Sequence, residues 1–584
     1  MWSIVAAYRR LLAREQGTVV KDWGGRIPVA LVFPNVYHAG MSNLGFQAVY
    51  GLFNSYPDVV CERAFVPDPA LAREYVRTGA PLLSLETQRP LYEFELVAFS
   101  LTYENDYPAV VSLLELARLA PRREARDAGD PLILAGGITM RTNPEPLADF
   151  LDLVLLGEAE AILPALLEAW RETRSYPLPK NDRVLHLALR TPGAYAPALY
   201  EAALDGEGRL ASFQPRRPEL PSRIKVARAQ GLPHPALTTQ VLTAATEFAA
   251  TKLVEIGRGC PHGCRFCAAG FVYRPPRFQT RAAIQAALGP PSASAERVGL
   301  ISPSAADHPE LAVIVRDLTD QGREVTVSSL RVESLNPELL AALALGGLRG
   351  AAIAPEAGSE RLRRFVNKRI SDTQIIEGAA DLARAGLRKI KLYFLLGLPT
   401  ETRDDVQAAL ELTRRIIERL DGLAGVKARP EIILSLGSFV PKPFTPLAAQ
   451  PMAEQKELKA RAGVLRGGLK RERGVRVHFD PPKWAYLQTL FSRGDRRAGT
   501  IVEALARHGR LAEALKQAPF DPDFYVRRNM EDDRLWPWSF IDHGFEPDFL
   551  SEELAGARSL VTTPACRPES CRRCGVCPGR NEAA

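Results

Sequence analysis

The most distinctive stretch of this chain reads Glu255-Ile-Gly-Arg-Gly-Cys-Pro-His-Gly-Cys-Arg-Phe-Cys-Ala-Ala-Gly270. It places Cys260, Cys264 and Cys267 on a glycine-rich loop, directly after an apolar run at residues 253–256 that is typical of a β-strand. Cubane iron–sulfur clusters normally take four cysteines, so three thiolates on one tight loop predict a cluster with one iron left open. A small molecule has to complete such a site.

Two alternatives to a cluster remain at this loop. One is zinc held by the three thiolates and His262, although structural zinc sites more often combine Cys-x2-Cys pairs from two places in the chain. The other is a set of unligated cysteines, which is less favoured because exposed thiols beside Arg258 and Arg265 would be reactive. The spacing therefore favours an iron–sulfur cluster over both alternatives.

The cysteine spacing, the flanking glycines and Phe266 together resemble the signature of radical S-adenosylmethionine (SAM) enzymes. The resemblance implies that Cys260, Cys264 and Cys267 form the catalytic centre by binding a 4Fe-4S cluster. It also implies that the amino and carboxylate groups of SAM fill the open iron, with Phe266 beside the cofactor.

Length, charge and cysteine usage narrow the class of protein. A chain of 584 residues is too long for one core, so several domains are expected. The formal charge of +7 gives only weak support for an RNA partner. Eight cysteines fall into a group of three, a group of four and the lone Cys61, which suits metal ligation in the cytoplasm better than disulfides. No apolar run reaches membrane-spanning length, so no membrane contact is expected.

Residues 1–170 alternate short apolar strands with amphipathic helices, which predicts a parallel α/β layer of Rossmann type. Strands are expected at residues 29–33, 96–101, 132–135 and 153–156, and helices at 108–119 and 160–170. Ligands of such sheets bind at the carboxyl ends of the strands, so the loops there hold the candidate binding residues. We expect the glycines of these loops to let the backbone approach a flat or phosphate-bearing ligand closely.

This layer, directly upstream of the cysteine loop, resembles the cobalamin-binding domain of cobalamin-dependent radical SAM enzymes. Typical cobalamin domains carry Asp-x-His-x-x-Gly, whose histidine coordinates cobalt, but this chain reads Asn35-Val-Tyr-His-Ala-Gly40, so His38 is a poor axial ligand. A layer that binds nothing and only covers the next domain or holds substrate is the alternative. The resemblance implies cobalamin contacts from Asn35, His38, Gly40, Ser42, Asn43, Gly45, Leu101, Thr102, Tyr103, Gly136, Gly137, Gly157 and Glu158.

Residues 251–446 alternate strands and helices again, with strand candidates at 253–256, 297–301, 325–328, 350–354, 389–395 and 431–439. Six such units resemble the partial (β/α)6 TIM barrel of radical SAM cores, which carries its chemistry at the carboxyl ends of the strands. Between the two domains, residues 171–250 are rich in proline and are expected to form a linker with one strand pair at 195–204 and 210–213.

The loops after the barrel strands hold the candidate SAM contacts. Ser302-Pro-Ser304 stands where the family usually has Gly-Gly-Glu, a departure in which hydroxyls would have to replace the contact with the SAM amino group. Taken singly, Arg331 and Glu333 also fit a solvated ion pair, and Glu356 fits a carboxylate at a helix start. The resemblance implies contacts from Ser302, Ser304, Ser328, Arg331 (SAM carboxylate), Glu356 (ribose), Ser359, and Leu395 and Leu396 (near adenine).

Residues 447–584 are expected to be mainly helical and to end in a second cysteine group. Its spacing is Cys566-x4-Cys571-x2-Cys574-x2-Cys577, and four thiolates suffice for a closed metal site. The spacing resembles ferredoxin loops and indicates an auxiliary 4Fe-4S cluster, with a four-cysteine zinc site as the alternative. The first helix of this region carries a run of Lys and Arg, which is usually a solvated face and less often a polyanion contact.

Residues 491–497 and 535–544 resemble segments of a bacterial group of cobalamin-domain radical SAM proteins whose reaction has not been assigned. The resemblance implies an enzyme that cleaves SAM to a 5′-deoxyadenosyl radical, with cobalamin-dependent methylation of an unactivated carbon as the expected reaction. Radical cyclisation, rearrangement or sulfur insertion, on RNA among other substrates, is the first alternative, and an iron–sulfur electron-transfer protein is the second. A flavodoxin or ferredoxin is the expected reducing partner.

Overall fold

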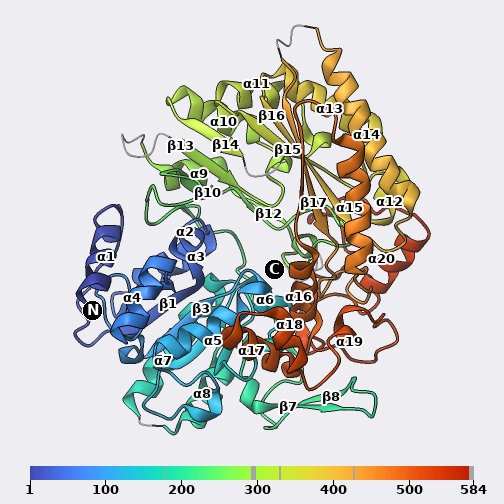
Figure 1. The fold of residues 1–584 in the computed structure, drawn as a ribbon. Helices are drawn as coiled ribbons and strands as arrows, with labels where there is room; N and C mark the ends of the chain where they lie inside the picture. The colour runs from blue at the N-terminus through green and yellow to red at the C-terminus, as the bar shows by residue number, and fades with distance from the viewer. Residues whose placement is uncertain (177, 291–296, 328–329, 425–427, 578–584) are drawn as a thin grey trace.

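The computed structural model describes residues 1–176, 178–290, 297–327, 330–424 and 428–577. Figure 1 shows an N-terminal α/β layer in blue, a second α/β body in green to orange, and red C-terminal helices packed where the two meet. The predicted fold class, a Rossmann-like layer followed by a partial barrel and a mainly helical C-terminal region, is confirmed. Within the described residues, no helix is both long enough and apolar enough to cross a membrane.

The N-terminal layer is built on a sheet with the strand order β2-β1-β3-β4-β5-β6. Neighbouring strands are parallel except β5 and β6, which run antiparallel. The central strands are apolar along their length because helices cover both faces of a parallel sheet. The strands are β1 (Ile27–Val36), β2 (Val59–Val66), β3 (Leu96–Ser100), β4 (Leu132–Gly136), β5 (Leu153–Leu155) and β6 (Ala194–Tyr195). The helices are α1 (Trp2–Leu12), α2 (Tyr37–Met41), α3 (Leu44–Ser55), α4 (Pro69–Thr78), α5 (Tyr107–Leu116), α6 (Ile138–Thr142), α7 (Ala159–Ser175) and α8 (Lys180–Arg190).

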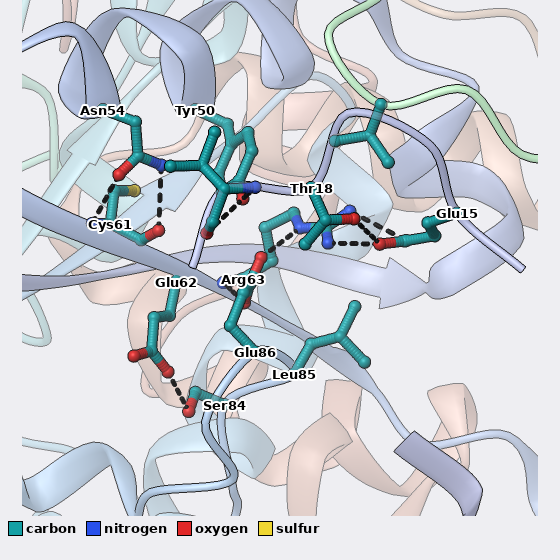
Figure 2. Close-up of polar contacts among 12 residues, drawn as sticks. Glu15, Thr18, Tyr50, Asn54, Cys61, Glu62, Arg63, Ser84, Leu85 and Glu86 are labelled. Carbon is teal, nitrogen blue, oxygen red and sulfur yellow. Dashed lines mark hydrogen bonds and ion pairs between the residues drawn. The ribbon is translucent and has the colours of Figure 1, made fainter. Parts of the chain in front are cut away.

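Strand β2 is missing from the strands that the sequence predicts, because two charged residues interrupt its apolar run. Glu62 and Arg63 are nevertheless buried, with 1% and 0% of their surfaces exposed. The Arg63 guanidinium lies 2.6 Å from Glu86 Oε1 and 2.7 Å from Glu15 Oε2, and Ser84 donates a hydrogen bond to Glu62 (Figure 2). Charges that are paired in this way can be accommodated inside a buried strand.

The first domain extends beyond the boundary expected at residue 170. Helix α7 continues to Ser175, and β6 joins the sheet beside β5, so residues up to Tyr195 belong to the layer rather than to a linker. The predicted strand pair is present as an antiparallel hairpin of β7 (Tyr200–Leu204) and β8 (Leu210–Pro215). After it, β9 (Ile224–Lys225) pairs with β19 (Ile541–Asp542), which ties this region to the C-terminal part of the chain.

The second body contains the six predicted strands, with small shifts at their ends, and one more. Among the described residues, hydrogen bonds join β10-β13-β14 in one parallel sheet and β15-β16-β17-β18 in another. The added strand, β18, lies beyond residue 446, so the barrel continues past the boundary expected there. The strands are β10 (Lys252–Glu255), β13 (Arg297–Ile301), β14 (Glu324–Val327), β15 (Gly350–Glu356), β16 (Lys389–Leu396), β17 (Glu431–Ser438) and β18 (Val475–Phe479). The helices are α9 (Arg281–Leu288), α10 (Leu311–Asp320), α11 (Pro337–Leu345), α12 (Glu360–Phe365), α13 (Asp372–Arg384), α14 (Arg403–Asp421) and α15 (Gln455–Leu469).

The C-terminal helices contact both bodies. Glu553 on α20 lies 3.2 Å from Arg265 of the second body. Asn143 of the N-terminal layer donates to the carbonyls of Ser492 (3.1 Å) and Gly494 (2.7 Å), at the end of α16. Arg122 pairs with Glu503 on α17 at 2.7 Å. These elements are α16 (Pro482–Arg493), α17 (Gly499–His508), α18 (Leu511–Lys516), α19 (Asp523–Val526) and α20 (Phe549–Arg558).

Candidate functional site

The three clustered cysteines lie on the loop that follows β10 and the short strand β11 (Gly257–Arg258). Strand β11 pairs antiparallel with β12 (Arg277–Phe278), which closes the loop at its base. Gly259 has a φ of +81°, and a Cβ there would lie 2.5 Å from the Tyr273 carbonyl oxygen, so only glycine fits. The backbone that leads into Cys260 is therefore fixed by the fold.

The thiols of this loop share one environment. Cys264 is buried, and Cys260 and Cys267 are half-buried. Burial, followed by the neighbouring thiols of Cys264 and Cys267, raises the pKa of Cys260 to about 12. Burial and then Cys264 raise the pKa of Cys267 to about 11. A metal therefore has to displace protons from these sulfurs to bind.

The zinc alternative at this loop depends on His262. Asp307 holds that ring, with 2.9 Å between Nε2 and Oδ2. In the described part of the chain, no three His, Cys, Asp or Glu side chains converge as ligands of a single metal ion. The sulfurs around one tetrahedral zinc stand roughly 4 Å apart, whereas the corners of an iron–sulfur cluster are more widely spaced. The described side chains therefore argue against a single zinc ion at this loop, and an iron–sulfur cluster stays compatible with it.

Several polar atoms at the carboxyl edge of the barrel strands are buried without a hydrogen-bond partner among the described residues. They are Ser304 Oγ, Arg331 Nε, Glu333 Oε2 and Ser438 Oγ. Arg331 and Glu333 also pair with each other, at 2.5 Å between Nη2 and Oε1. Because buried polar groups normally have partners, these unused donors and acceptors fit a polar ligand such as the SAM expected from the sequence.

Glu356 ends β15 in a strained conformation at the same edge. Its φ of 67° is uncommon for a residue other than glycine, and the pairing with β16 shifts register between Ile353 and Glu356. The carboxylate lies 3.7 Å from Lys368 Nζ, and burial raises its pKa. Backbone strain of this kind often occurs at ligand sites, which agrees with the predicted role of Glu356.

The remaining serines predicted to contact SAM differ in their surroundings. Ser302 is buried and lines the cavity between the two bodies that is described below. Ser359 caps α12 by accepting from the Leu362 N–H, and its hydroxyl donates to Asp405. That hydroxyl is engaged within the protein, which argues against the predicted contact with SAM. Ser328 lies outside the described residues.

The apolar residues predicted near SAM lie in two different apolar clusters. Leu395 and Phe266 pack in one small apolar cluster, although they are more than a hundred residues apart in the chain. Leu396 instead belongs to the main core and is 2% exposed. The structure therefore brings Leu395, but not the side chain of Leu396, to the cysteine loop.

A cavity of about 560 Å³ lies between the N-terminal layer and the cysteine loop. Helix α3 forms one wall, the carboxyl ends of β4 and β5 a second, and the residues just before Cys260 a third. The α3 wall is apolar and includes the small residues Gly45 and Ala48. A Cβ at Gly45 would meet only Asn43 Oδ1, at 3.2 Å. The apolar side chains of this wall could pack against one face of a flat ligand such as the predicted cobalamin. The lining includes Gly45, Ala48, Gly137, Gly157, Glu158, Arg258 and Ser302.

Two glycines of this cavity are required by the packing of the protein. A Cβ at Gly137, whose φ is +110°, would lie 2.2 Å from the Leu101 carbonyl oxygen. A Cβ at Gly157 would lie 2.4 Å from the Ala227 carbonyl oxygen. Gly40 is likewise a packing residue, against Phe65. These glycines therefore let neighbouring segments of the protein approach. Gly137 and Gly157 also line the cavity, so their predicted contacts with cobalamin stay predictions.

Apart from Gly45, the loop after β1 does not present its predicted cobalamin contacts to the cavity. His38 is exposed on α2 and lines a separate cavity. Asn35 donates to Asp106 at 2.9 Å, and Ser42 donates to the His38 carbonyl at 2.6 Å. Asn43 caps α3 by accepting from the Phe46 N–H at 2.9 Å. Of this loop, Gly45 is the predicted residue that lines the cavity.

The predicted contacts after β3 and β4 lie elsewhere as well. Leu101 is buried in the core, and Thr102 and Gly136 are half-buried outside the lining of that cavity. Tyr103 is 40% exposed and lines a second cavity of about 530 Å³. This second cavity lies at the carboxyl ends of β17 and β18, and its walls include Ser438, Asp480 and Trp484.

Arg258 connects the cysteine loop to the N-terminal layer, a role that sequence reasoning missed. Its guanidinium lies 3.1 Å from Glu158, 2.8 Å from Glu160 and 2.9 Å from Glu255, and Arg277 pairs with Glu158 as well. The Gly-Glu-Ala-Glu segment at 157–160 thus binds the N-terminal layer to Arg258, which lies two residues before Cys260. The acidic segment and the arginine are both visible in the sequence, but their pairing depends on how the two domains meet.

The second cysteine group lies in the tail after α20. Cys566 and Cys574 are buried, and Cys571 and Cys577 are half-buried. Burial raises the pKa of Cys566 to about 12, against an opposing effect of Arg274. The tail lies against the first cysteine loop, because the Cys566 N–H donates to the Pro261 carbonyl at 2.8 Å.

The basic helix α15 is partly engaged within the protein. Arg461 pairs with Glu401 and Glu457, and Arg466 lies over the Phe479 ring at 5.7 Å. The other basic residues in and just after this helix are exposed: Lys456, Lys459, Lys470, Arg471 and Arg473. The predicted RNA contact stays a prediction.

Two proteins of known sequence resemble the chain. The uncharacterized protein MJ0966 of Methanocaldococcus jannaschii is 27% identical over 513 residues, which cover 87% of this chain and 97% of that protein. The uncharacterized methyltransferase PH0819 of Pyrococcus horikoshii is 26% identical over 100 residues, 17% of this chain and 22% of that protein. The longer match extends through both α/β bodies.

One solved structure shares the fold over most of its length. It is the radical S-adenosylmethionine methyltransferase TsrM from Kitasatospora setae, determined with cobalamin and a 4Fe-4S cluster bound. The match has a TM-score of 0.51 at 14% identity and covers 83% of this chain and all of TsrM. At that identity, the likeness concerns the fold.

Two family models match the two α/β bodies in turn. The model of the N-terminal region of radical SAM proteins matches residues 45–197. The model of the radical SAM superfamily matches residues 254–413, which begin six residues before Cys260. With both models matched in this order, the chain belongs to the radical SAM superfamily.

Proposed function

We propose that the protein is a cobalamin-dependent radical SAM methyltransferase that acts on an unactivated carbon. The observation that carries the proposal is the cavity of about 560 Å³, whose walls come from the carboxyl ends of β4 and β5 and from the loop that bears Cys260. A ligand in this cavity would contact both the N-terminal layer and the cysteine loop. The fold likeness to TsrM supports the same function.

On this proposal the residues of the chain hold and orient the reactants. When bound, a 4Fe-4S cluster with SAM supplies a 5′-deoxyadenosyl radical, and methylcobalamin supplies a methyl group. Cys260, Cys264 and Cys267 would hold the iron. Arg331 Nε would donate to the SAM carboxylate and Glu333 Oε2 would accept from the SAM amino group, because both atoms are buried, unpartnered among the described residues and opposite in charge to those groups.

The second cavity fits the substrate on this proposal. It lies at the carboxyl ends of β17 and β18, on the same edge of the parallel sheet as Glu356 at the end of β15. Tyr103 and Trp484 expose 40% and 44% of their surfaces there, and Ser438 Oγ is unpartnered among the described residues. Such walls suit an organic substrate with an apolar or ring-bearing face and one group that hydrogen-bonds to Ser438.

The test uses anaerobically reconstituted protein loaded with hydroxocobalamin and reduced with dithionite. After incubation with SAM that carries a deuterated methyl group, we expect 5′-deoxyadenosine in solution and a deuterated methyl group on the bound corrinoid. The readouts are chromatography and mass spectrometry, and neither requires the substrate to be known. The variant Cys264→Ala should form no 5′-deoxyadenosine and should still bind corrinoid, since Cys264 is not part of the cavity lining.

Two outcomes would contradict the proposal in different ways. If 5′-deoxyadenosine forms but no corrinoid binds, the protein is a radical SAM enzyme with another reaction. If corrinoid binds and SAM stays intact in the reduced protein, the radical chemistry itself is refuted.

A further inference from the structure

The C-terminal tail is attached to the first cysteine loop by its backbone. The Cys566 N–H donates to the Pro261 carbonyl at 2.8 Å. The Thr563 N–H donates to Asn367 Oδ1 at 2.8 Å, and Asn367 Nδ2 donates in turn to the Gly263 carbonyl at 3.0 Å. Pro261 and Gly263 both lie between Cys260 and Cys264, so the tail is held at two points of the loop.

Arg265 provides a third attachment from inside the cysteine motif. The residue is 1% exposed and lies directly after Cys264. Its Nη2 donates to the Val561 carbonyl at 2.7 Å, and its Nε lies 3.2 Å from Glu553 Oε2 on α20. Glu553 also accepts from the Thr563 hydroxyl at 2.8 Å. A residue of the cysteine motif thus anchors the C-terminal segment.

The tail itself has little regular structure to hold it in place. Among the described residues from 561 to 577 there are turns but neither helix nor strand. Even so, Cys566 and Cys574 are 8% and 3% exposed, and Cys574 packs against Phe271 and Phe549. The Cys574 carbonyl accepts from the Glu546 N–H at 3.0 Å. An irregular segment that buries cysteines in this way is typical of segments stabilised by a bound metal.

We propose that Cys566, Cys571, Cys574 and Cys577 bind a second metal centre through four thiolates, and that this centre clamps the Cys260 loop through the contacts of Cys566 and Arg265. Four thiolates suit an iron–sulfur cluster, whose corners are widely spaced. Zinc is the alternative outcome of the test, and it would require the described cysteine side chains to converge further around a single ion. The clamp acts on the loop whichever reaction the protein catalyses. This inference therefore goes beyond the proposed function and can fail independently of it.

The first experiment measures iron, zinc and acid-labile sulfide in the full chain purified without oxygen. Relative to the unmodified protein, Cys571→Ser with Cys577→Ser should lose either about four irons with their sulfide or about one zinc. The loss identifies which metal the tail binds. Cys61→Ala is the matched control, since it removes a cysteine that belongs to neither group, and it should keep the full metal content. Equal metal in the double variant and the unmodified protein would refute the second centre.

The second experiment tests the clamp by hydrogen exchange of the loop amides at 260–267. In the Cys571→Ser, Cys577→Ser variant we expect these amides to exchange at least about tenfold faster, because the tail no longer holds the loop. The iron of the first loop should remain. The variant Arg265→Met with Glu553→Gln removes the anchor and also the 3.1 Å pair of Glu553 with Arg573. Because the Arg573 side chain is 44% exposed, no buried charge is left unpaired. It should keep the tail metal and show the same faster exchange. Unchanged exchange in both variants would overturn the clamp even if the tail binds metal.

Discussion

The two α/β bodies present different carboxyl edges to each other. At the barrel edge, Arg331 Nε and Ser438 Oγ are buried without partners among the described residues. At the edge of the N-terminal layer, Glu158 is bound by two arginines, and Gly137 is packed against the Leu101 carbonyl. The difference teaches that the barrel edge keeps polar groups for a ligand. The N-terminal edge uses Glu158 and its glycines for domain docking and packing. It offers a ligand the apolar wall of α3 and Arg141, whose Nε is buried without a partner among the described residues.

The largest loss of activity should follow from replacing the three cysteines that are expected to bind the first cluster. Replacing Cys260, Cys264 and Cys267 together with alanine should abolish 5′-deoxyadenosine formation and remove about four irons per chain. Metal analysis and chromatography of the reaction mixture measure both losses. Tail metal should stay in place. Loss of all metal would instead show that the two cysteine groups form one shared site.

The glycines of the N-terminal edge provide the sharpest test of the comparison. Gly137→Ala should destabilise the protein by about 3–4 kcal/mol, because its Cβ would lie 2.2 Å from a backbone oxygen at a φ of +110°. Gly45→Ala, on the same cavity, meets only Asn43 Oδ1 at 3.2 Å and should keep nearly full stability. Urea unfolding monitored by circular dichroism gives both values. Equal stability of the two variants would mean that Gly137 is not a packing residue.

Breaking the contact between the two bodies at Arg258 should lower the free energy of unfolding somewhat less than Gly137→Ala does. Arg258→Gln leaves Glu160 and Glu255 without their partner in a mostly buried site, which should cost about 3 kcal/mol. The matched control is Arg316→Gln, which breaks the exposed pair with Glu338 and should cost under about 1 kcal/mol. Their side chains are 51% and 59% exposed. Similar urea midpoints for the two variants would contradict a docking role for Arg258.

A smaller, pH-dependent effect is expected at Asp106, which follows β3 of the N-terminal layer. Burial raises the pKa of Asp106 from 3.8 to about 6. Between these two values the folded protein binds more protons at this group than the unfolded chain does, so stability falls as pH rises from 4 to 6. Asp106→Asn should therefore gain roughly 1–2 kcal/mol over the unmodified protein between these limits. Parallel stability profiles across this range would show that the carboxyl is not buried.

Much of the fold follows from hydrophobic periodicity, and the exceptions have physical causes. Strand β13 has the bounds expected from the sequence, because its apolar run is uninterrupted. Strand β2 escapes prediction because Arg63 is neutralised by Glu15 and Glu86, which are distant in sequence. Strand β18 escapes because it lies at the edge of its sheet and exposes Arg476 and His478.

The candidate site also contains features that the sequence predicts and contacts that it does not. The cysteine loop is local in sequence and could be predicted, and so could Arg331 and Glu356, which follow barrel strands in order. The docking of Glu158 on Arg258 and the anchoring of the tail by Arg265 could not, because each joins segments about a hundred or more residues apart. The packing role of Gly137 could not be predicted either, because periodicity does not show that the Leu101 carbonyl lies beside it.

The central claim is that the cavity between the bodies holds a corrinoid, and its most direct test is corrinoid content read from the visible spectrum. Protein loaded with hydroxocobalamin and desalted should retain about one corrinoid per chain. Ala48→Phe, which fills the α3 wall of the cavity, should retain at most about a tenth of that amount at unchanged stability. Equal retention in the two proteins, or none in the unmodified one, would contradict the account.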